Sequence, residues 1–318
     1  MTAMQQVVDH IFSRELARTA TALSFVLLAT SLMNIVVFPL FDPVFTYARD
    51  VSVFASSAAL IGIGLVAAFR PALLRVRLLQ RVALGCLAAG AALVPLSLYA
   101  LSPIGLVVGA SLAAVGRSWV VVAVGMAASR LGVRQAGVCV SLAFVAYYLM
   151  TALVWVVPVV AGVALFFVLP FASLALAWPR ARAVLEAAET GEAPADFSIT
   201  QPSSFLPLGS QLFVCLFLFR VAFGYSLRFG EVGGVPLSDF LVIVPVAAVA
   251  LYAVLSRKTF PADLLAQVSV LFVVAGFFLG SMLYDRAPFA SVTLLSAGNT
   301  LFDMVAWVAL IAVARART

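Results

Sequence analysis

Long apolar stretches follow one another along almost the whole chain, separated by short polar or turn-forming segments. Each stretch is close to the roughly 20 residues that an α-helix needs to cross the hydrocarbon core of a bilayer. Strands of a membrane β-barrel would be shorter, at about ten residues of alternating polarity. The pattern therefore predicts about ten membrane-spanning helices, at residues 20–40, 50–69, 82–100, 104–129, 136–157, 159–178, 206–227, 237–255, 264–284 and 289–313.

The composition excludes the main alternatives to a membrane protein. Of the 318 residues, 64% are hydrophobic and only 10% are charged, and the mean hydropathy is +1.17. Soluble domains have about 45–50% apolar and about 25% charged residues. A soluble enzyme, a secreted disulfide scaffold and a disordered tail are all inconsistent with these values. We expect an all-α integral membrane protein in contact with the lipid bilayer.

Positively charged residues predict the orientation of the chain. Cytoplasmic segments of membrane proteins are enriched in Arg and Lys. If the N-terminus is cytoplasmic, fourteen positive residues lie in inner segments and three lie in outer loops. The outer residues are Arg49, Arg228 and Arg286. Both termini, including the tail 314–318, are therefore expected in the cytoplasm. This bias also accounts for the net charge of +6 without nucleic-acid binding.

Two polar segments complete the predicted organisation. Residues 1–19 carry Val7, Val8, Ile11, Phe12 and Leu16 on one helical face, which is typical of a helix lying on the inner membrane surface. Residues 179–205 form a long polar cytoplasmic loop whose first part suits a short amphipathic helix. The loop divides the chain into a six-helix half, 20–178, and an incomplete four-helix half, 206–313.

Ionisable and amide side chains occur at mid-depth in four of the predicted spans. Arg117 lies near the centre of the fourth span, Arg220 in the seventh and Asp303 in the tenth. Placing a charge at the bilayer centre costs at least about 2.5–3.5 kcal/mol, so each needs a physical explanation. Asn299 and Trp307 lie one turn before and one turn after Asp303, and Asn34 is in the first span.

Two arginines against one aspartate leave a surplus of positive charge among these residues. The planar guanidinium suits carboxylate or phosphate groups, so the expected ligand is a small anionic molecule bound by Arg117, Arg220, Asp303, Asn299, Asn34 and Trp307. The competing interpretation is structural. In it the arginines extend toward the membrane surface, or pair with Asp303 only to orient helix packing.

The sequence offers little for catalysis or metal binding. His10 is the only histidine, and the cysteines, Cys86, Cys139 and Cys215, lie in apolar stretches without a CxxC motif. No phosphate-binding glycine loop or hydrolytic carboxylate pair is present. We expect no enzymatic activity, no cofactor and no metal. Gly105–Gly109 and Gly276–Gly280 have GxxxG spacing, which we interpret as close packing between helices of the same chain.

The layout of six spans, a long inner loop and further spans resembles the major facilitator superfamily, which is built from three-helix repeats. The resemblance implies that spans one, four, seven and ten line a central cavity, and these are the spans with the mid-depth polar residues. The chain departs from the family between spans two and three. The usual Gly-x-x-x-Asp-Arg-x-Gly-Arg-Arg signature is absent there, and the segment from Arg70 to Arg81 is basic but lacks the Asp and the glycines.

Two short stretches are similar to a narrower group. Asn299 to Leu310, and Phe223-Gly224-Tyr225, resemble the facilitator-like membrane region of bacterial LuxR-type regulators, in which twelve spans precede a helix-turn-helix domain. This resemblance implies a signal-sensing region in the bacterial inner membrane, truncated and with no DNA-binding residues in this chain. The alternatives are a secondary transporter of a small organic anion, with Asp303 carrying a coupling proton, and a non-functional remnant of a longer gene.

Overall fold

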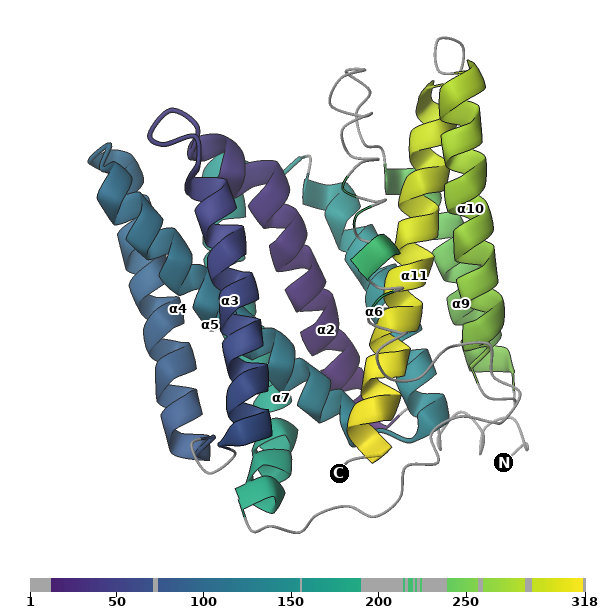
Figure 1. Ribbon diagram of the computed structural model, residues 1–318, viewed down its shortest axis with the longest axis horizontal. Coiled ribbons are helices and arrows are strands. Elements are labelled where there is room, and N and C mark those ends of the chain that lie inside the picture. Colours follow the sequence, from purple (N-terminus) through teal and green to yellow (C-terminus); the bar gives the residue numbers. More distant parts are fainter. Residues whose placement is uncertain are drawn as a thin grey trace. The chain divides into compact units, whose positions relative to one another are not determined.

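The computed structural model describes residues 13–70, 74–154, 156–189, 214, 217–219, 221, 224, 239–256, 260–283 and 288–316. Every regular element in these ranges is helical. Eight helices there are long and apolar enough to cross a membrane, and a ninth apolar helix, Ile243–Leu255, is shorter. Figure 1 shows the long helices as extended rods. The chain is therefore a multi-pass helical membrane protein. Most of the predicted span 206–227 lies outside the described residues.

The chain divides into two compact units. The first unit holds α2 (Arg14–Leu32), α3 (Ala48–Phe69), α4 (Val76–Tyr99), α5 (Pro103–Ser129) and α7 (Val159–Glu189). Helix α5 is its centre, because it packs against α2, α3, α4 and α7. Figure 1 shows α4 and α5 running side by side.

Helices α4 and α5 approach closely because glycines lie at their contact. A Cβ atom added at Gly90 of α4 would lie 2.6 Å from the Cβ of Ala113, and one added at Gly109 of α5 would lie 2.9 Å from the Cβ of Leu93. Such distances leave no room for even a methyl group. Gly105 faces Ser97 of α4 in the same way. The interpretation of Gly105–Gly109 as packing within the chain is confirmed.

The second unit contains α9 (Ile243–Leu255), α10 (Ala262–Leu283), α11 (Pro288–Ala316) and residues 131–149 of α6 (Val133–Val154). Glycines again allow close contact, here between α10 and α11. A Cβ atom at Gly276 would lie 2.7 Å from Leu295, and one at Gly298 would lie 2.8 Å from the carbonyl oxygen of Ser269. The hydroxyl of Ser291 donates a hydrogen bond to the carbonyl of Gly276 at 2.7 Å. Gly276–Gly280 is therefore a packing motif as well.

Two helices, α2 and α7, extend beyond the spans predicted from the sequence. Helix α2 begins at Arg14, where Ser13 accepts a hydrogen bond from the backbone N–H of Leu16, so the first span has no break near residue 19. Helix α7 continues through Pro179 to Glu189, so the helix expected at the start of segment 179–205 is continuous with the preceding span. An ion pair between Arg182 and Glu186, one turn apart at 2.6 Å, supports this extension.

The predicted span 237–255 begins as a short 3₁₀ helix, η4 (Asp239–Val242), followed by the 13 residues of α9. Pro245 falls in the first turn of α9. A proline is tolerated there because its missing N–H would have no partner within the helix.

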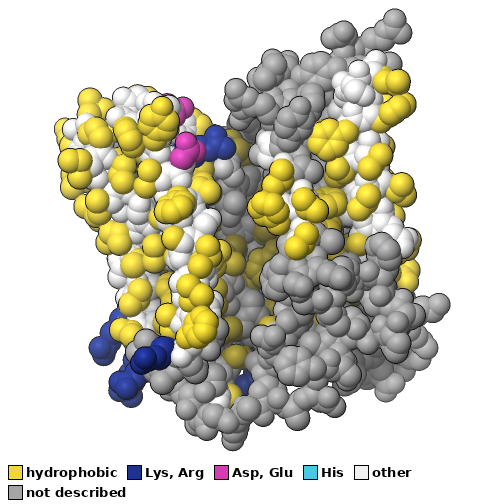
Figure 2. Space-filling model, viewed as in Figure 1, with side chains coloured by type: hydrophobic (Ala, Val, Ile, Leu, Met, Phe, Trp, Pro, Cys, Tyr) yellow, Lys and Arg dark blue, Asp and Glu magenta, His cyan; other side chains and the backbone are white. Residues whose placement is uncertain are grey.

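Basic residues gather at one end of the first unit. The start of α2 and the end of α7 meet there through an ion pair between Glu15 and Arg180. The end of α5 joins them, since Arg130 donates to the carbonyl of Ala183 at 3.3 Å. Figure 2 shows dark blue side chains at this end, a smaller group of dark blue and magenta side chains at the opposite end, and mainly apolar side chains between them. The gathering agrees with the charge bias used to predict orientation, and the cytoplasmic placement of the termini stays a prediction.

Candidate functional site: a cavity at Arg117

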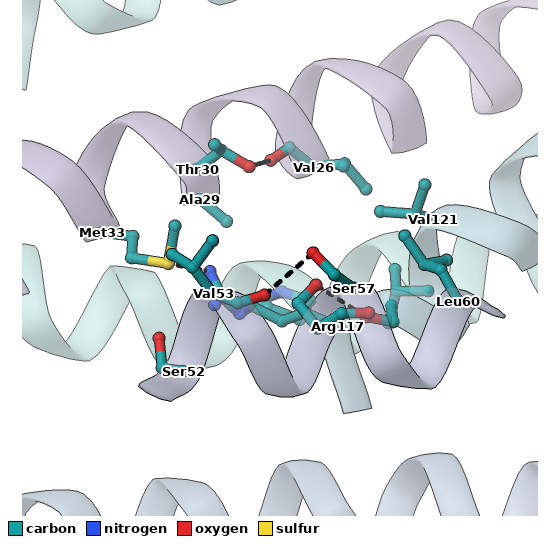
Figure 3. A pocket seen from close by; sticks show the side chains of 14 residues that line it. Val26, Ala29, Thr30, Met33, Ser52, Val53, Ser57, Leu60, Arg117 and Val121 are labelled. Atoms are coloured by element: carbon teal, nitrogen blue, oxygen red, sulfur yellow. Dashed lines mark hydrogen bonds between the residues drawn. The ribbon is translucent and has the colours of Figure 1, made fainter. Parts of the chain in front are cut away.

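A cavity of about 220 Å³ lies within the first unit, between α2, α3, α5 and α7. Eight of its fourteen lining residues are apolar, and six are polar or charged. The polar and charged residues are Thr30, Ser52, Ser56, Ser57, Arg117 and Ser118. Figure 3 shows Thr30 of α2, Met33 at the start of the next segment, Ser52 and Ser57 of α3, and Arg117 of α5 around the cavity. The site thus combines one guanidinium with several hydroxyls on an apolar background.

Arg117 enters the cavity from the middle of α5. Its Nη1 donates to the thioether sulfur of Met33, and its guanidinium carbon lies 5.0 Å from the centre of the Phe166 ring. Its buried Nε has no hydrogen-bond partner among the described residues. Within that part of the chain, the ion pairs involve Arg180 and Arg182 but not Arg117.

The contacts of Arg117 compensate only part of the cost of its charge. A thioether sulfur is a weak acceptor, and a cation–π contact contributes about 0.5–2 kcal/mol. A charge within a bilayer costs at least about 2.5–3.5 kcal/mol. An anion bound by the Arg117 Nε–H would supply the negative charge that Met33 and Phe166 do not.

Helix α2 is distorted where it meets Arg117. Its last regular turn passes into a π-helical segment, η1 (Met33–Val37), and then into a 3₁₀ turn, η2 (Phe38–Leu40). The backbone N–H of Phe38 bonds to the carbonyl of Met33, which is the wide spacing of a π-helix. Such segments are frequent at functional sites because they redirect side chains. Here the widened turn begins at the residue that contacts the guanidinium.

Hydroxyl groups from α2, α3 and α5 line the cavity. Ser56 and Ser118 form a hydrogen bond at 2.8 Å, and the Ser118 hydroxyl lies 3.0 Å from the carbonyl of Ala114 and 3.2 Å from that of Ser56. The hydroxyls of Ser57 and Thr30 donate to carbonyls one turn earlier on their own helices. Ser52 differs, since it is 2% exposed and its hydroxyl has no partner in the described residues.

Two donors of residues that line this cavity, the Arg117 Nε–H and the Ser52 hydroxyl, are buried and have no hydrogen-bond partner among the described residues. Both can donate to the oxygen atoms of a carboxylate or phosphate. The guanidinium contributes charge and a planar array of N–H groups, and the hydroxyl contributes a neutral donor. The arrangement is suited to binding an anion. In the described residues, no three His, Cys, Asp or Glu side chains are grouped to hold a metal ion.

The structure places the other predicted site residues elsewhere. Asn34 is exposed, donates from Nδ2 to the carbonyl of Thr30 at 3.0 Å, and does not line this cavity. Asn299, Asp303 and Trp307 lie on α11 in the second unit. Arg220 lies outside the described residues. A single site shared by all six residues stays a prediction.

On α11, Asn299 is 8% exposed, and its side-chain oxygen has no hydrogen-bond partner among the described residues. Asp303 and Trp307 are half-buried. The next residue after Asn299, Thr300, forms a buried hydrogen bond of 2.6 Å with the hydroxyl of Tyr148 on α6. The hydrogen bond between Thr300 and Tyr148 thus links this polar part of α11 to α6.

The sequence interpretation missed Ser52, Ser56 and Ser118, and it missed Met33 and Phe166 as neighbours of Arg117. One signal was available for the serines. Ser52 and Ser56 are four residues apart and share a face of α3, and Ser118 follows Arg117 directly. Serine is common enough in membrane helices that this spacing identifies a site only when the facing helix is known.

Comparisons with known proteins identify no family. No family model matches the chain, and no curated protein matches it. A solved structure with some similarity is the crystal structure of the human organic anion transporter MFSD10 (TETRAN), at 16% sequence identity and a TM-score of 0.43. The alignment covers 99% of this chain and 92% of that one. This similarity is too low to carry an argument about fold or function.

Proposed function

We propose that the protein is a membrane carrier that binds a small organic anion in the cavity at Arg117 and moves it across the bilayer. The proposal includes a facilitator-like arrangement of about ten spans. The eight candidate spans and the shorter helix α9 support the number of spans, because they fall on nine of the ten stretches predicted from the sequence. Transport was the alternative to sensing in the sequence interpretation.

The observation that carries the proposal is the state of the Arg117 guanidinium. It is placed in a membrane helix, beside a cavity, with a buried Nε–H that has no partner in the described residues. A purely structural arginine should instead reach the membrane surface or meet a carboxylate. Arg180 and Arg182 of α7 both meet one, in Glu15 and Glu186.

The lining of the cavity limits the class of ligand. One guanidinium favours a single carboxylate or phosphate group, and the serine hydroxyls suit further acceptor oxygens on it. The apolar residues, among them Val26, Leu60 and Val121, suit a short hydrocarbon portion. A cavity of about 220 Å³ is too small for a long acyl chain or a nucleotide in the conformation described. Small monocarboxylates are the first candidates.

Binding is tested with the full chain purified in detergent. Acetate, butyrate, benzoate and inorganic phosphate are titrated while thermal stability is followed, since a ligand that binds the folded state raises Tm with concentration. Arg117→Gln should abolish the rise. The matched control is Arg18→Gln, which removes the same charge from an exposed position on α2. The proposal fails if no anion raises Tm, or if both variants respond like the parent chain.

Transport is tested by uptake of the bound anion into proteoliposomes. Uptake by the parent chain and its loss in Arg117→Gln would support a carrier. Binding without uptake would contradict the transport step and favour the sensor interpretation. The resemblance to LuxR-type regulators has no support beyond the short stretches that suggested it, and Phe223 and Tyr225 lie outside the described residues.

A further inference from the structure

We propose that the basic end of α3 and α4 binds anionic phospholipid headgroups of the adjoining leaflet. The surface concerned, called the α3–α4 basic surface, combines exposed arginines with exposed apolar side chains. Its residues are Phe69, Arg70, Arg75, Arg77, Leu78 and Arg81. The inference is independent of the cavity at Arg117.

The charge of this surface is not neutralised within the described structure. Residues 51–185 contain nine arginines and no Asp or Glu. The two carboxylates of the first unit that are described at this end, Glu15 and Glu186, pair with Arg180 and Arg182. The four arginines of the α3–α4 basic surface make no ion pair among the described residues.

The arrangement of the arginines on α4 increases the local positive potential. Arg77 and Arg81 are four residues apart on one helical face, where like charges repel. Arg75 is at the N-cap position of α4, and a helix N-terminus itself carries partial positive charge. An anion at this surface relieves repulsion among groups that the fold holds close together.

The apolar residues indicate that the anion belongs to a lipid. Phe69 is 77% exposed and Leu78 is 50% exposed, directly beside Arg70 and Arg77 in the chain. Both belong to helices long and apolar enough to span the membrane. A phospholipid can place its phosphate against the arginines and its glycerol and upper acyl chains against Phe69 and Leu78. A free phosphate ion would use only the first of these contacts.

The experiment uses the full chain in detergent and three probes, namely phosphatidylglycerol, phosphatidylcholine and inorganic phosphate. Native mass spectrometry measures the lipid retained on the protein, and Tm is followed at each concentration. We expect phosphatidylglycerol to bind and to raise Tm, and this effect to weaken as salt increases, because salt screens exposed charges. Phosphatidylcholine and phosphate should produce neither effect.

Two single variants carry the same change of charge. Arg77→Gln should weaken phosphatidylglycerol binding about fivefold, since an arginine at an anionic membrane surface contributes roughly 1 kcal/mol. Arg182→Gln removes an arginine that is already paired with Glu186 and should leave binding unchanged. Arg77→Lys should retain most of the affinity because it keeps the charge.

The proposal is overturned if phosphatidylcholine binds as well as phosphatidylglycerol, if inorganic phosphate reproduces the rise in Tm, or if Arg182→Gln weakens binding as much as Arg77→Gln. None of these outcomes bears on the cavity, because Arg117 keeps its surroundings in all three variants. Failure of the carrier proposal in turn leaves this result unaffected.

Discussion

The two sides of helix α5 differ in how closely they are packed. One side packs against α4 through Gly109 and Gly116, where an added Cβ atom would meet side-chain and backbone atoms within 3 Å. The other side begins at the next residue, Arg117, and faces a cavity with Ser118, Val120 and Val121. The first side stabilises the unit by close contact, whereas the second leaves space and free donors. The comparison indicates that close packing of α5 against α4 holds Arg117 and Ser118 in position beside the cavity.

The largest effect should come from filling the contact between α4 and α5. Gly90→Ala places a methyl group 2.6 Å from the Cβ of Ala113 and 2.7 Å from its backbone nitrogen. Because backbone cannot move aside cheaply, we expect a loss of about 1–3 kcal/mol of stability, measured as a fall in Tm in detergent. Gly85→Ala on the same helix is the control, since nothing lies within 4 Å of its added methyl. Equal effects of the two variants would contradict close packing at this contact.

The hydroxyl pair on the cavity side should have a smaller effect on stability. Ser118→Ala removes the hydrogen bond to Ser56 and leaves the Ser56 hydroxyl without that partner. The expected loss is about 0.5–1.5 kcal/mol, again read from Tm. The same substitution at Ser57, which bonds only to its own helix, should change Tm less. A larger loss at Ser57 than at Ser118 would contradict the assigned pairing.

Replacing Ser52 should weaken anion binding without lowering the stability of the free protein. Its hydroxyl is buried without a partner among the described residues, so Ser52→Ala should leave Tm of the free protein unchanged or slightly higher. If the hydroxyl donates to a bound anion, affinity for that anion should fall by about threefold to tenfold, the equivalent of one neutral hydrogen bond. Isothermal titration with the anion that raises Tm most is the appropriate measurement. Unchanged affinity would show that the Ser52 hydroxyl does not bind the anion.

The smallest effect concerns the turn that joins α4 to α5. Leu101 has φ 49°, a left-handed conformation that a side chain makes unfavourable, and it is 67% exposed. Leu101→Gly should stabilise the protein by up to about 1 kcal/mol, because glycine adopts this conformation without the steric cost. The control is Ala100→Gly, at the helix end where φ is −81° and no such gain is expected. A fall in Tm for Leu101→Gly would show that the turn is not strained.

Much of the helical framework could be predicted because hydropathy is a local property of the sequence. The stretches around Arg117 and Asp303 were correctly placed in helices for this reason. The start of α2 was misplaced, and the helix expected after residue 179 was not foreseen as continuous with α7. Ser13 as a helix cap and the pairing of Arg182 with Glu186 depend on local geometry that hydropathy does not record. The close contacts at Gly109 and Gly276 were foreseen from spacing alone.

The candidate site was predicted less well because it depends on which helices are neighbours. The depth of Arg117 in its span marked it as unusual, and the structure places it beside a cavity. Ser52 and Met33 contribute to the same site only because α2 and α3 both flank that cavity, and no spacing in the sequence states this. Asn34 was included for its depth in the first span, yet its amide bonds to its own helix and is exposed.

The central claim is that Arg117 is kept in the membrane to bind an anion. The most direct measurement is a comparison of Arg117→Gln with the parent chain, for both anion affinity and thermal stability without ligand. The account predicts that affinity falls by about tenfold to more than a hundredfold, the equivalent of one charge-assisted contact. It also predicts that Tm of the free protein is unchanged or rises, because a charge without a counter-ion among the described residues is removed. A marked fall in Tm with no change in affinity would contradict the claim and leave Arg117 with a structural role.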